Sequence, residues 1–134
     1  MKNKISLIRI EHPEDGLSVW RSRDEFDYSK LRGHSKFDDI VDRHCNPKLF
    51  PTFDEDYQLK DQISVWDIEN YHFAFKSLEQ LKSGFTMSEL KELIEDLGFE
   101  VLMLTVTDYF ESDYQVVFKK ESIIQKENIS FMFL

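Results

Sequence analysis

The stretch Asn70–Thr107, NYHFAFKSLEQLKSGFTMSELKELIEDLGFEVLMLTVT, contains two helix-start signatures. Ser77 with Gln80 and Thr86 with Glu89 both have the capping-box spacing. In this pattern the hydroxyl accepts a backbone N–H that has no partner within the helix, and the longer side chain reaches back to the cap residue. The sequence therefore predicts two successive helices in this stretch.

A glycine follows each predicted helix, at Gly84 and Gly98. Glycine reaches the left-handed backbone conformation without steric cost, so both residues are predicted to end their helices. The apolar segments Tyr71–Phe75 and Phe99–Thr107 flank the pair and have the composition of strands, the second of them central in a sheet. A strand–helix–helix–strand unit is predicted.

Further strands are predicted on both sides of this unit. Ile5–Glu11 is apolar on both faces, which indicates an interior strand, and Tyr114–Lys119 alternates like a half-exposed strand. Asp108–Asp113 is predicted to be the connecting turn, and Ile129–Leu134 the final strand. Between the first two strands the only helix signal begins at Ser35.

These elements predict an α+β fold in a single domain, residues 1–134. We expect a mostly antiparallel or mixed sheet of about four or five strands with two helices packed on one face. A long irregular insertion follows the first strand, and a connection of that kind often carries function.

The composition narrows the class of partner. The net charge of −9 argues against sequence-independent nucleic-acid binding, which requires basic side chains to displace counterions from phosphates. Acidity favours a basic protein partner, although it also suits solubility alone. The chain has a single cysteine, and its N-terminal segment resembles neither a signal peptide nor a membrane span, so a reducing cytoplasmic location is expected.

Sequence motifs for catalysis or metal binding are missing. The four histidines, with Cys45 beside His44, have none of the spacings of a zinc site, so no metal is predicted. The sequence also contains no glycine-rich phosphate loop and no G-x-S-x-G nucleophile motif.

An acidic segment with interleaved aromatic residues is the main binding candidate. One interpretation is a solvated surface. The other is a surface that docks on a basic groove through its carboxylates and is anchored by its aromatic rings. The residues assigned to it are Phe53, Asp54, Glu55, Asp56, Tyr57, Asp61, Trp66, Asp67 and Glu69.

Arg9 lies on a largely apolar strand, where a guanidinium requires an anionic partner or an exit to solvent. A structural ion pair is one interpretation of this residue. An anion or nucleotide site is the other.

The blocks IRIEHPEDGLSVWRS, NYHFAFKSLEQL and DYQVVF together resemble a group of small uncharacterised proteins of phages and prophages. That resemblance implies a setting in which small acidic proteins act on host machinery, as anti-CRISPR and other anti-defence inhibitors do.

The layout of the same blocks is also similar to the ADP-ribosyltransferase superfamily, which implies NAD as cofactor. The matching positions are Arg9 or His12, Tyr71 with Ser77, and Gln115. Gln115 stands where that family has a catalytic Glu, and an amide cannot supply the negative charge that stabilises an oxocarbenium-like centre.

Our interpretation of the sequence is therefore a cytoplasmic phage or prophage accessory protein without a cofactor. It would bind and inhibit a host nucleic-acid-handling defence complex, a protein or ribonucleoprotein with a basic surface. The alternative is an ADP-ribosyltransferase-like enzyme, or an inactive relative, that uses Arg9, Tyr71 and Gln115.

Overall fold

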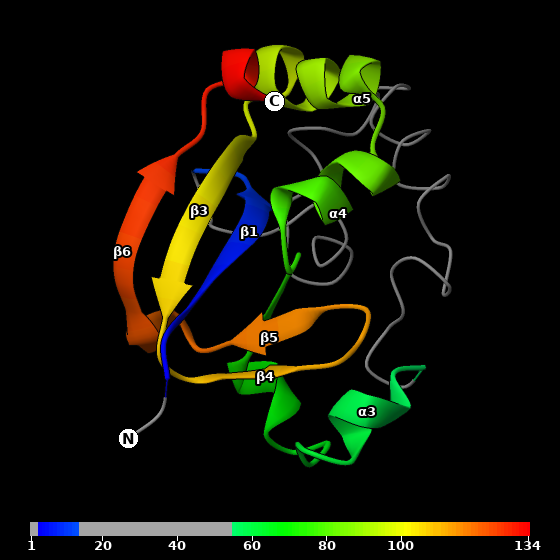
Figure 1. The fold of residues 1–134 in the computed structure, drawn as a ribbon, viewed down its shortest axis with the longest axis vertical. Helices are drawn as coiled ribbons and strands as arrows, with labels where there is room; N and C mark the ends of the chain where they lie inside the picture. Colours follow the sequence, from blue (N-terminus) through cyan, green and yellow to red (C-terminus); the bar gives the residue numbers. More distant parts are fainter. Residues whose placement is uncertain (1–2, 14–54) are drawn as a thin grey trace.

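The computed structural model describes residues 3–13 and 55–134 (Figure 1). Strand β1 (Ile5–Glu11) pairs antiparallel with β3 (Glu100–Val106), which in turn pairs antiparallel with β6 (Ile123–Asn128). The strand order is β1-β3-β6, so β3 is central, as predicted from its two apolar faces. The Ile5–Glu11 strand has the predicted bounds, but it is an edge strand of its sheet and not the interior strand that its two apolar faces indicated.

A second antiparallel sheet has the order β2-β5-β4 and consists of β2 (His72–Ala74), β5 (Val116–Phe118) and β4 (Tyr109–Glu111). The residue after β2, Phe75, connects the two sheets. Its N–H donates to the Ile8 carbonyl at 2.7 Å, and the Ile8 N–H donates back to the Phe75 carbonyl at 2.9 Å. The outer edge of β1 is thereby partly paired.

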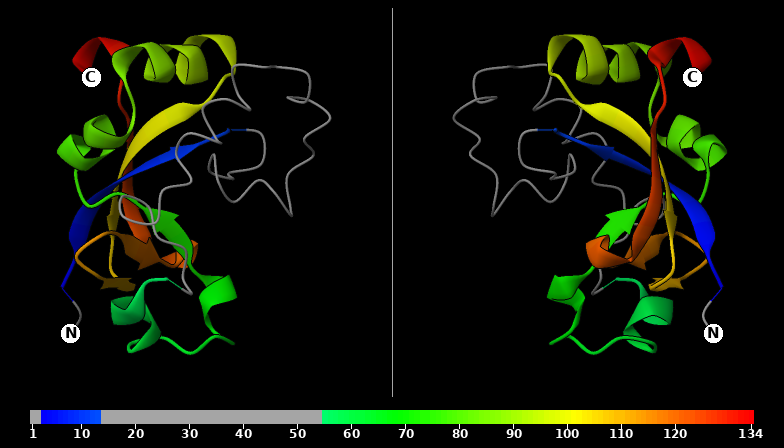
Figure 2. Two further views of the ribbon diagram at one scale, coloured as in Figure 1. Left: turned by 90° about the vertical axis from the view of Figure 1, so that its right-hand side faces the viewer. Right: turned by 90° about the vertical axis from the view of Figure 1, so that its left-hand side faces the viewer.

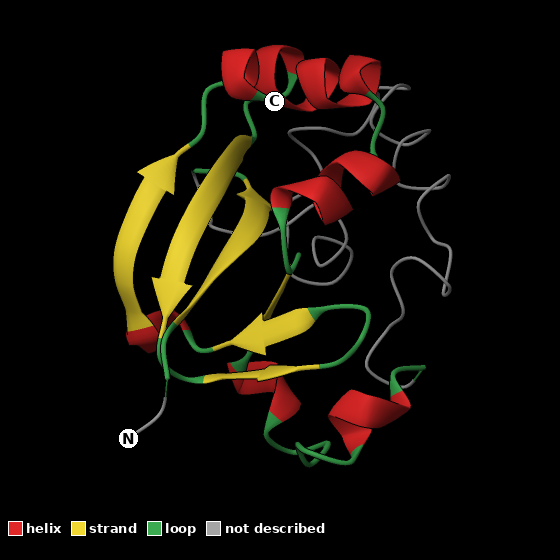
Figure 3. Ribbon diagram, in the orientation of Figure 1, coloured by secondary structure: helices red, strands yellow, loops and turns green. Residues whose placement is uncertain are grey.

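The predicted α+β class is confirmed, and Figure 3 shows its strands divided between two three-stranded sheets rather than gathered in one. The reason lies in Asp108–Asp113, which is not the connecting turn that the sequence predicted. This segment contains strand β4, and the hairpin to β5 turns over residues 112–115, where the Ser112 N–H donates to the Gln115 carbonyl at 2.9 Å.

Two helices follow β2, namely α4 (Leu78–Gly84) and α5 (Met87–Lys91). The Ser77 hydroxyl caps α4 by accepting the Gln80 N–H at 3.1 Å. The predicted capping box of α5 is complete, since the Thr86 hydroxyl accepts the Glu89 N–H and the Glu89 carboxylate accepts the Thr86 N–H.

The two helix ends differ from each other. Beyond α5 the chain continues as a π-helical turn, η3 (Glu92–Asp96), and Gly98 then takes a φ of +79°, as predicted for a helix-ending glycine. The first helix also ends at its predicted glycine, Gly84, but the left-handed conformation predicted there was wrong. Gly84 is the last residue of α4, and its φ is not positive. The chain leaves the helix through Phe85, which has an extended conformation.

The core has two layers on opposite faces of the β1-β3-β6 sheet. One face carries α4, α5 and η3, which confirms that two helices pack on one face. The other face packs on the second sheet. The first layer includes Ile8, Ile10, Leu81, Phe85, Leu90, Leu93 and Val101, and the second includes Leu7, Ala74, Leu102, Leu104, Val116 and Phe118.

Of two strands predicted near the C-terminus, Tyr114–Lys119 is present as the shorter β5 but differs in its exposure, and the prediction of a strand over Ile129–Leu134 was wrong. Val116–Phe118 is fully buried rather than half exposed, because β5 lies between β2 and β4 with one face on the core of the first sheet and the other against Leu59 and Ile63. Ile129–Leu134 is not a strand, and its residues form the 3-10 turn η5 (Phe131–Phe133) at the same end of the molecule as α5 (Figure 1). The last strand is instead the polar segment β6, which suits a sheet edge.

The side views in Figure 2 place η5 and α5 at one end of the molecule and α3 (Tyr57–Lys60) at the other. The described residues include only the last part of the predicted irregular insertion, which contains α3 and leads into the 3-10 turn η2 (Ile68–Asn70), whereas the helix predicted at Ser35 lies outside them.

Candidate functional site

Asp56 is the N-cap residue of helix α3, and its carboxylate is buried, with only 1% of the residue exposed. Oδ1 accepts the Leu59 N–H at 3.2 Å, which caps the helix. Oδ2 accepts the Ser112 hydroxyl at 2.6 Å and the Gln115 side-chain amide at 2.9 Å. The assignment of Asp56 to a docking surface is therefore corrected, because this carboxylate is enclosed by its own donors.

Two glutamines attach α3 and the following turn to the β4–β5 hairpin. The Gln58 side chain donates to the Asp113 carboxylate at 3.0 Å and accepts the Asp113 N–H at 2.6 Å. The Gln62 side chain donates to the Glu111 carbonyl at 3.0 Å. Beneath these bonds Leu59 and Ile63 pack with Tyr71 and Val117 in a third apolar cluster. Segment 55–70 is thus fixed to the body by side-chain contacts at several points.

The same segment leaves three apolar side chains in solvent. Tyr57, the first residue of α3, is 76% exposed. Val65 and Trp66 occupy the corner of a turn in which the Asp67 N–H donates to the Ser64 carbonyl at 3.0 Å, and they are 62% and 83% exposed. Single exposed apolar residues are ordinary in proteins, whereas two aromatic rings held outward on a fixed segment have the features of binding anchors.

Exposed carboxylates accompany these rings. Asp61 follows Tyr57 by one helical turn, since its N–H donates to the Tyr57 carbonyl at 3.1 Å. Asp67 follows Trp66 directly, and its Oδ2 accepts the Ser64 hydroxyl at 3.1 Å. We call the exposed set the acidic–aromatic surface, and it consists of Glu55, Tyr57, Asp61, Val65, Trp66, Asp67 and Glu69.

Of the nine residues predicted for partner binding, six are therefore exposed on one fixed segment, Asp56 is internal, and Phe53 and Asp54 lie outside the described residues. The sequence reasoning missed Val65, which stands as an isolated apolar residue between polar ones. It also missed Gln58 and Gln62, whose role depends on a hairpin about fifty residues further along the chain.

Arg9 forms the structural ion pair that was one of its two interpretations. Its Nε lies 2.6 Å from Oε2 of Glu11, and Nη1 donates to the Phe73 carbonyl at 2.6 Å. The guanidinium carbon also lies 5.7 Å from the centre of the Phe118 ring. Arg9 thereby ties β1 to the second sheet.

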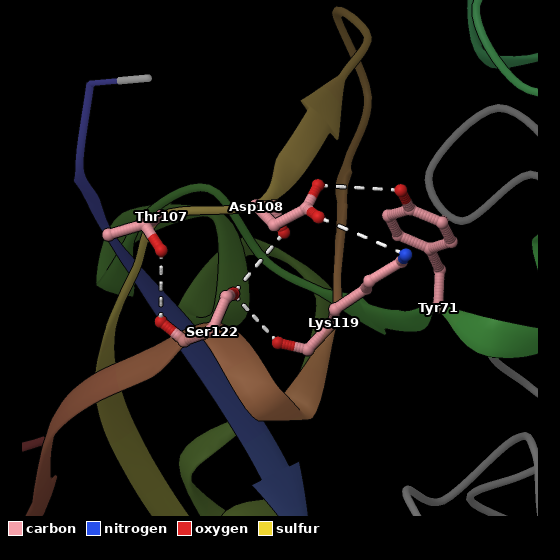
Figure 4. A network of polar contacts seen from close by, with 5 residues as sticks. All are labelled: Tyr71, Thr107, Asp108, Lys119 and Ser122. Carbon is pink, nitrogen blue, oxygen red and sulfur yellow. Dashed lines mark hydrogen bonds and ion pairs between the residues drawn. The ribbon is translucent and has the colours of Figure 1, made fainter. Parts of the chain in front are cut away.

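Tyr71 belongs to a polar network at the end of β5 (Figure 4). Its hydroxyl donates to Oδ1 of Asp108 at 3.4 Å, and the Lys119 ammonium lies 4.0 Å from Oδ2 of Asp108 and 5.4 Å from the Tyr71 ring. The Ser122 hydroxyl, in turn η4 (Lys120–Ser122), donates to the Lys119 carbonyl at 2.8 Å. Burial, followed by the negative charge of Asp108, raises the pKa of Tyr71.

The three residues of the enzyme interpretation take part in separate internal contacts. Arg9 bonds Glu11, Tyr71 bonds Asp108, and Gln115 bonds Asp56.

Within residues 3–13 and 55–134, no three His, Cys, Asp or Glu side chains gather closely enough to hold a metal ion. In the same part of the chain no helix has both the length and the apolar content to cross a bilayer.

The fold and the acidic–aromatic surface define a small acidic α+β protein. The model of one protein family, described as Bacteriophage T4 Y00F protein, matches residues 1–132. The chain therefore belongs to this phage protein family. Comparisons with curated proteins and with solved structures gave no match.

Proposed function

We propose that this phage-family protein binds and inhibits a host nucleic-acid-handling defence complex, in the manner of an anti-CRISPR protein, through its acidic–aromatic surface. The proposed location is the host cytoplasm, and the proposed partner is a protein or ribonucleoprotein with a basic surface. One observation carries the proposal: Tyr57 and Trp66 are held outward beside exposed carboxylates on a segment that side-chain bonds fix to the body.

Charge supports this choice of partner. A net charge of −9 repels nucleic acid and attracts the basic channels in which defence complexes hold it. Exposed carboxylates speed encounter with such a channel, and aromatic anchors supply contact area at a low cost in side-chain entropy.

The experiment uses bacteria with an active CRISPR system that targets a test phage. Plasmids supply the wild-type protein or one of three variants, and plaque formation is measured. The surface variant combines Tyr57→Ala with Trp66→Ala. The apolar control combines Met132→Ala with Phe133→Ala, two exposed residues at the opposite end of the molecule. The charge control combines Glu79→Gln, Glu95→Gln and Asp96→Asn, three exposed acids outside the acidic–aromatic surface.

We expect the wild-type protein and both controls to restore plaques and the surface variant to fail. Tagged wild-type protein should also co-purify the effector complex, and the surface variant should not. Absence of plaque restoration by the wild-type protein across hosts with different CRISPR effectors, together with no co-purified nucleic-acid-handling complex, would reject the proposed target.

A further inference from the structure

We propose that the acidic–aromatic surface is specific for arginine, and that its ligand is an arginine-bearing segment of a protein. This inference rests on the proposed function for its setting and adds the chemistry of the contact. It is carried by two exposed aromatic rings, each followed within four residues by exposed carboxylates on a segment that side-chain bonds fix to the body.

The first such pair is formed by Tyr57 and Asp61. Residues one helical turn apart lie on the same side of a helix, and the Asp61 N–H bonded to the Tyr57 carbonyl sets that spacing here. Both side chains are exposed. A guanidinium that stacks on the phenol ring can therefore also pair with the carboxylate.

The second ring, Trp66, is followed along the chain by two exposed acids, Asp67 and Glu69. The Ser64 hydroxyl donates a hydrogen bond to Oδ2 of Asp67 and so holds this carboxylate in the turn. Trp66 is the most exposed aromatic side chain among the described residues, and indole is the best partner for a cation–π contact.

Arginine fits this arrangement better than lysine does. Its guanidinium is planar and weakly hydrated, so one side chain can stack on a ring while its edge pairs with a carboxylate. A lysine ammonium is compact and strongly hydrated, so its affinity for this surface comes mainly from its charge. Each exposed cation–π contact contributes a factor of about 2 to 5 in affinity, so two of them predict an arginine preference of about 10-fold.

The other candidates for covering the exposed rings fit less well. A second copy of this chain would bring together two net charges of −9. Nucleic acid would be repelled from the carboxylates in the same way. An arginine-bearing segment is complementary both to the rings and to their charge.

The test measures dissociation constants by calorimetry for two peptides of equal length and charge, one alternating Arg with Gly and the other alternating Lys with Gly. The wild-type protein should bind the arginine peptide about 10-fold more tightly than the lysine peptide. Replacing Trp66 by leucine keeps an apolar side chain but removes the ring, so the preference should fall to a few-fold. The double variant Tyr57→Ala, Trp66→Ala should bind both peptides equally and weakly.

Two controls separate the effect of the rings from that of charge. Asp61→Asn combined with Asp67→Asn should weaken binding of both peptides, whereas the Met132→Ala, Phe133→Ala variant should bind them as the wild-type protein does. Circular dichroism of each variant checks the fold. Because the replaced residues are all exposed, melting temperatures should stay close to that of the wild-type protein.

Equal affinity of the wild-type protein for the two peptides would overturn the proposal, as would an arginine preference that survives in the double variant. Dimerisation of the wild-type protein that disappears in the double variant would also overturn it, because a second copy would then cover the rings. This test needs no host component. Failed plaque restoration with a retained arginine preference would reject only the defence target, and the reverse result would reject only the arginine ligand.

Discussion

Replacing the buried Asp56 by alanine should lower the free energy of unfolding by about 3 kcal/mol. The loss of the cap on Leu59 costs about 1 kcal/mol. The Ser112 hydroxyl and the Gln115 amide each lose the carboxylate as acceptor, at about 1 to 3 kcal/mol apiece. We take the low end of this sum because the hydroxyl can rotate and water can enter the space left by the carboxylate.

The assay is urea denaturation followed by far-ultraviolet circular dichroism. A loss of about 3 kcal/mol corresponds to a decrease in melting temperature of roughly 10 °C for a chain of this size. Asp56→Asn keeps an oxygen for the cap and should lose about half as much stability. The control is Glu69→Ala, an exposed acid of the same segment, which should change stability by no more than about 0.5 kcal/mol.

Equal denaturation midpoints for the Asp56→Ala variant and the wild-type protein would refute the reasoning. Such a result would mean that the carboxylate is solvated and that α3 is not held through it. The fixed presentation of Tyr57 and Trp66, on which both proposals rest, would then lose its main support.

Two further predictions concern the caps and the network at β5. Thr86→Ala removes the hydroxyl of the α5 capping box and should cost about 1 kcal/mol in the same assay, whereas Ser88→Ala, exposed in the same helix, should leave stability within about 0.5 kcal/mol. The raised pKa of Tyr71 means that above about pH 10 the unfolded chain binds fewer protons than the folded chain, so stability falls as pH rises. Urea midpoints measured across this range should fall less steeply for Tyr71→Phe, and an identical slope would contradict the prediction.

The parts of the fold that the sequence predicted correctly are set by neighbours in the chain. The Thr86 capping box and the left-handed Gly98 each involve groups only a few residues apart. The apolar pattern of Phe99–Thr107 likewise predicted a central strand, because burial on both faces leaves a continuous apolar run.

The wrong predictions depend on contacts between distant segments. Gln115 and Lys119 flank Val116–Phe118 and give it an alternating pattern, yet β2 and β4 enclose this strand on both sides. At the C-terminus the apolar residues of Ile129–Leu134 suggested a strand, but they pack on the core as a turn while the polar segment before them takes the sheet edge.

At the candidate site, too, the sequence predicted the features set by neighbouring residues and not those set by distant contacts. Composition was sufficient to find the exposed rings and carboxylates of segment 55–69. It was not sufficient to separate Asp56 from Asp61, because the donors that enclose Asp56 come from Ser112 and Gln115, more than fifty residues away. A run of acids looks uniform in sequence even when one of them is internal.

The buried acid and the exposed acids of segment 55–69 contribute to binding in different ways. Asp56, inside, holds α3 in place, whereas Asp61 and Asp67, outside, are available to a partner. A surface that is already ordered before contact avoids most of the entropy cost of ordering side chains and loops on binding. Replacing Asp56 should therefore weaken both stability and binding, while replacing an exposed residue of the acidic–aromatic surface should weaken binding alone, and comparing the two classes measures how much of the affinity comes from the fixed position of the segment.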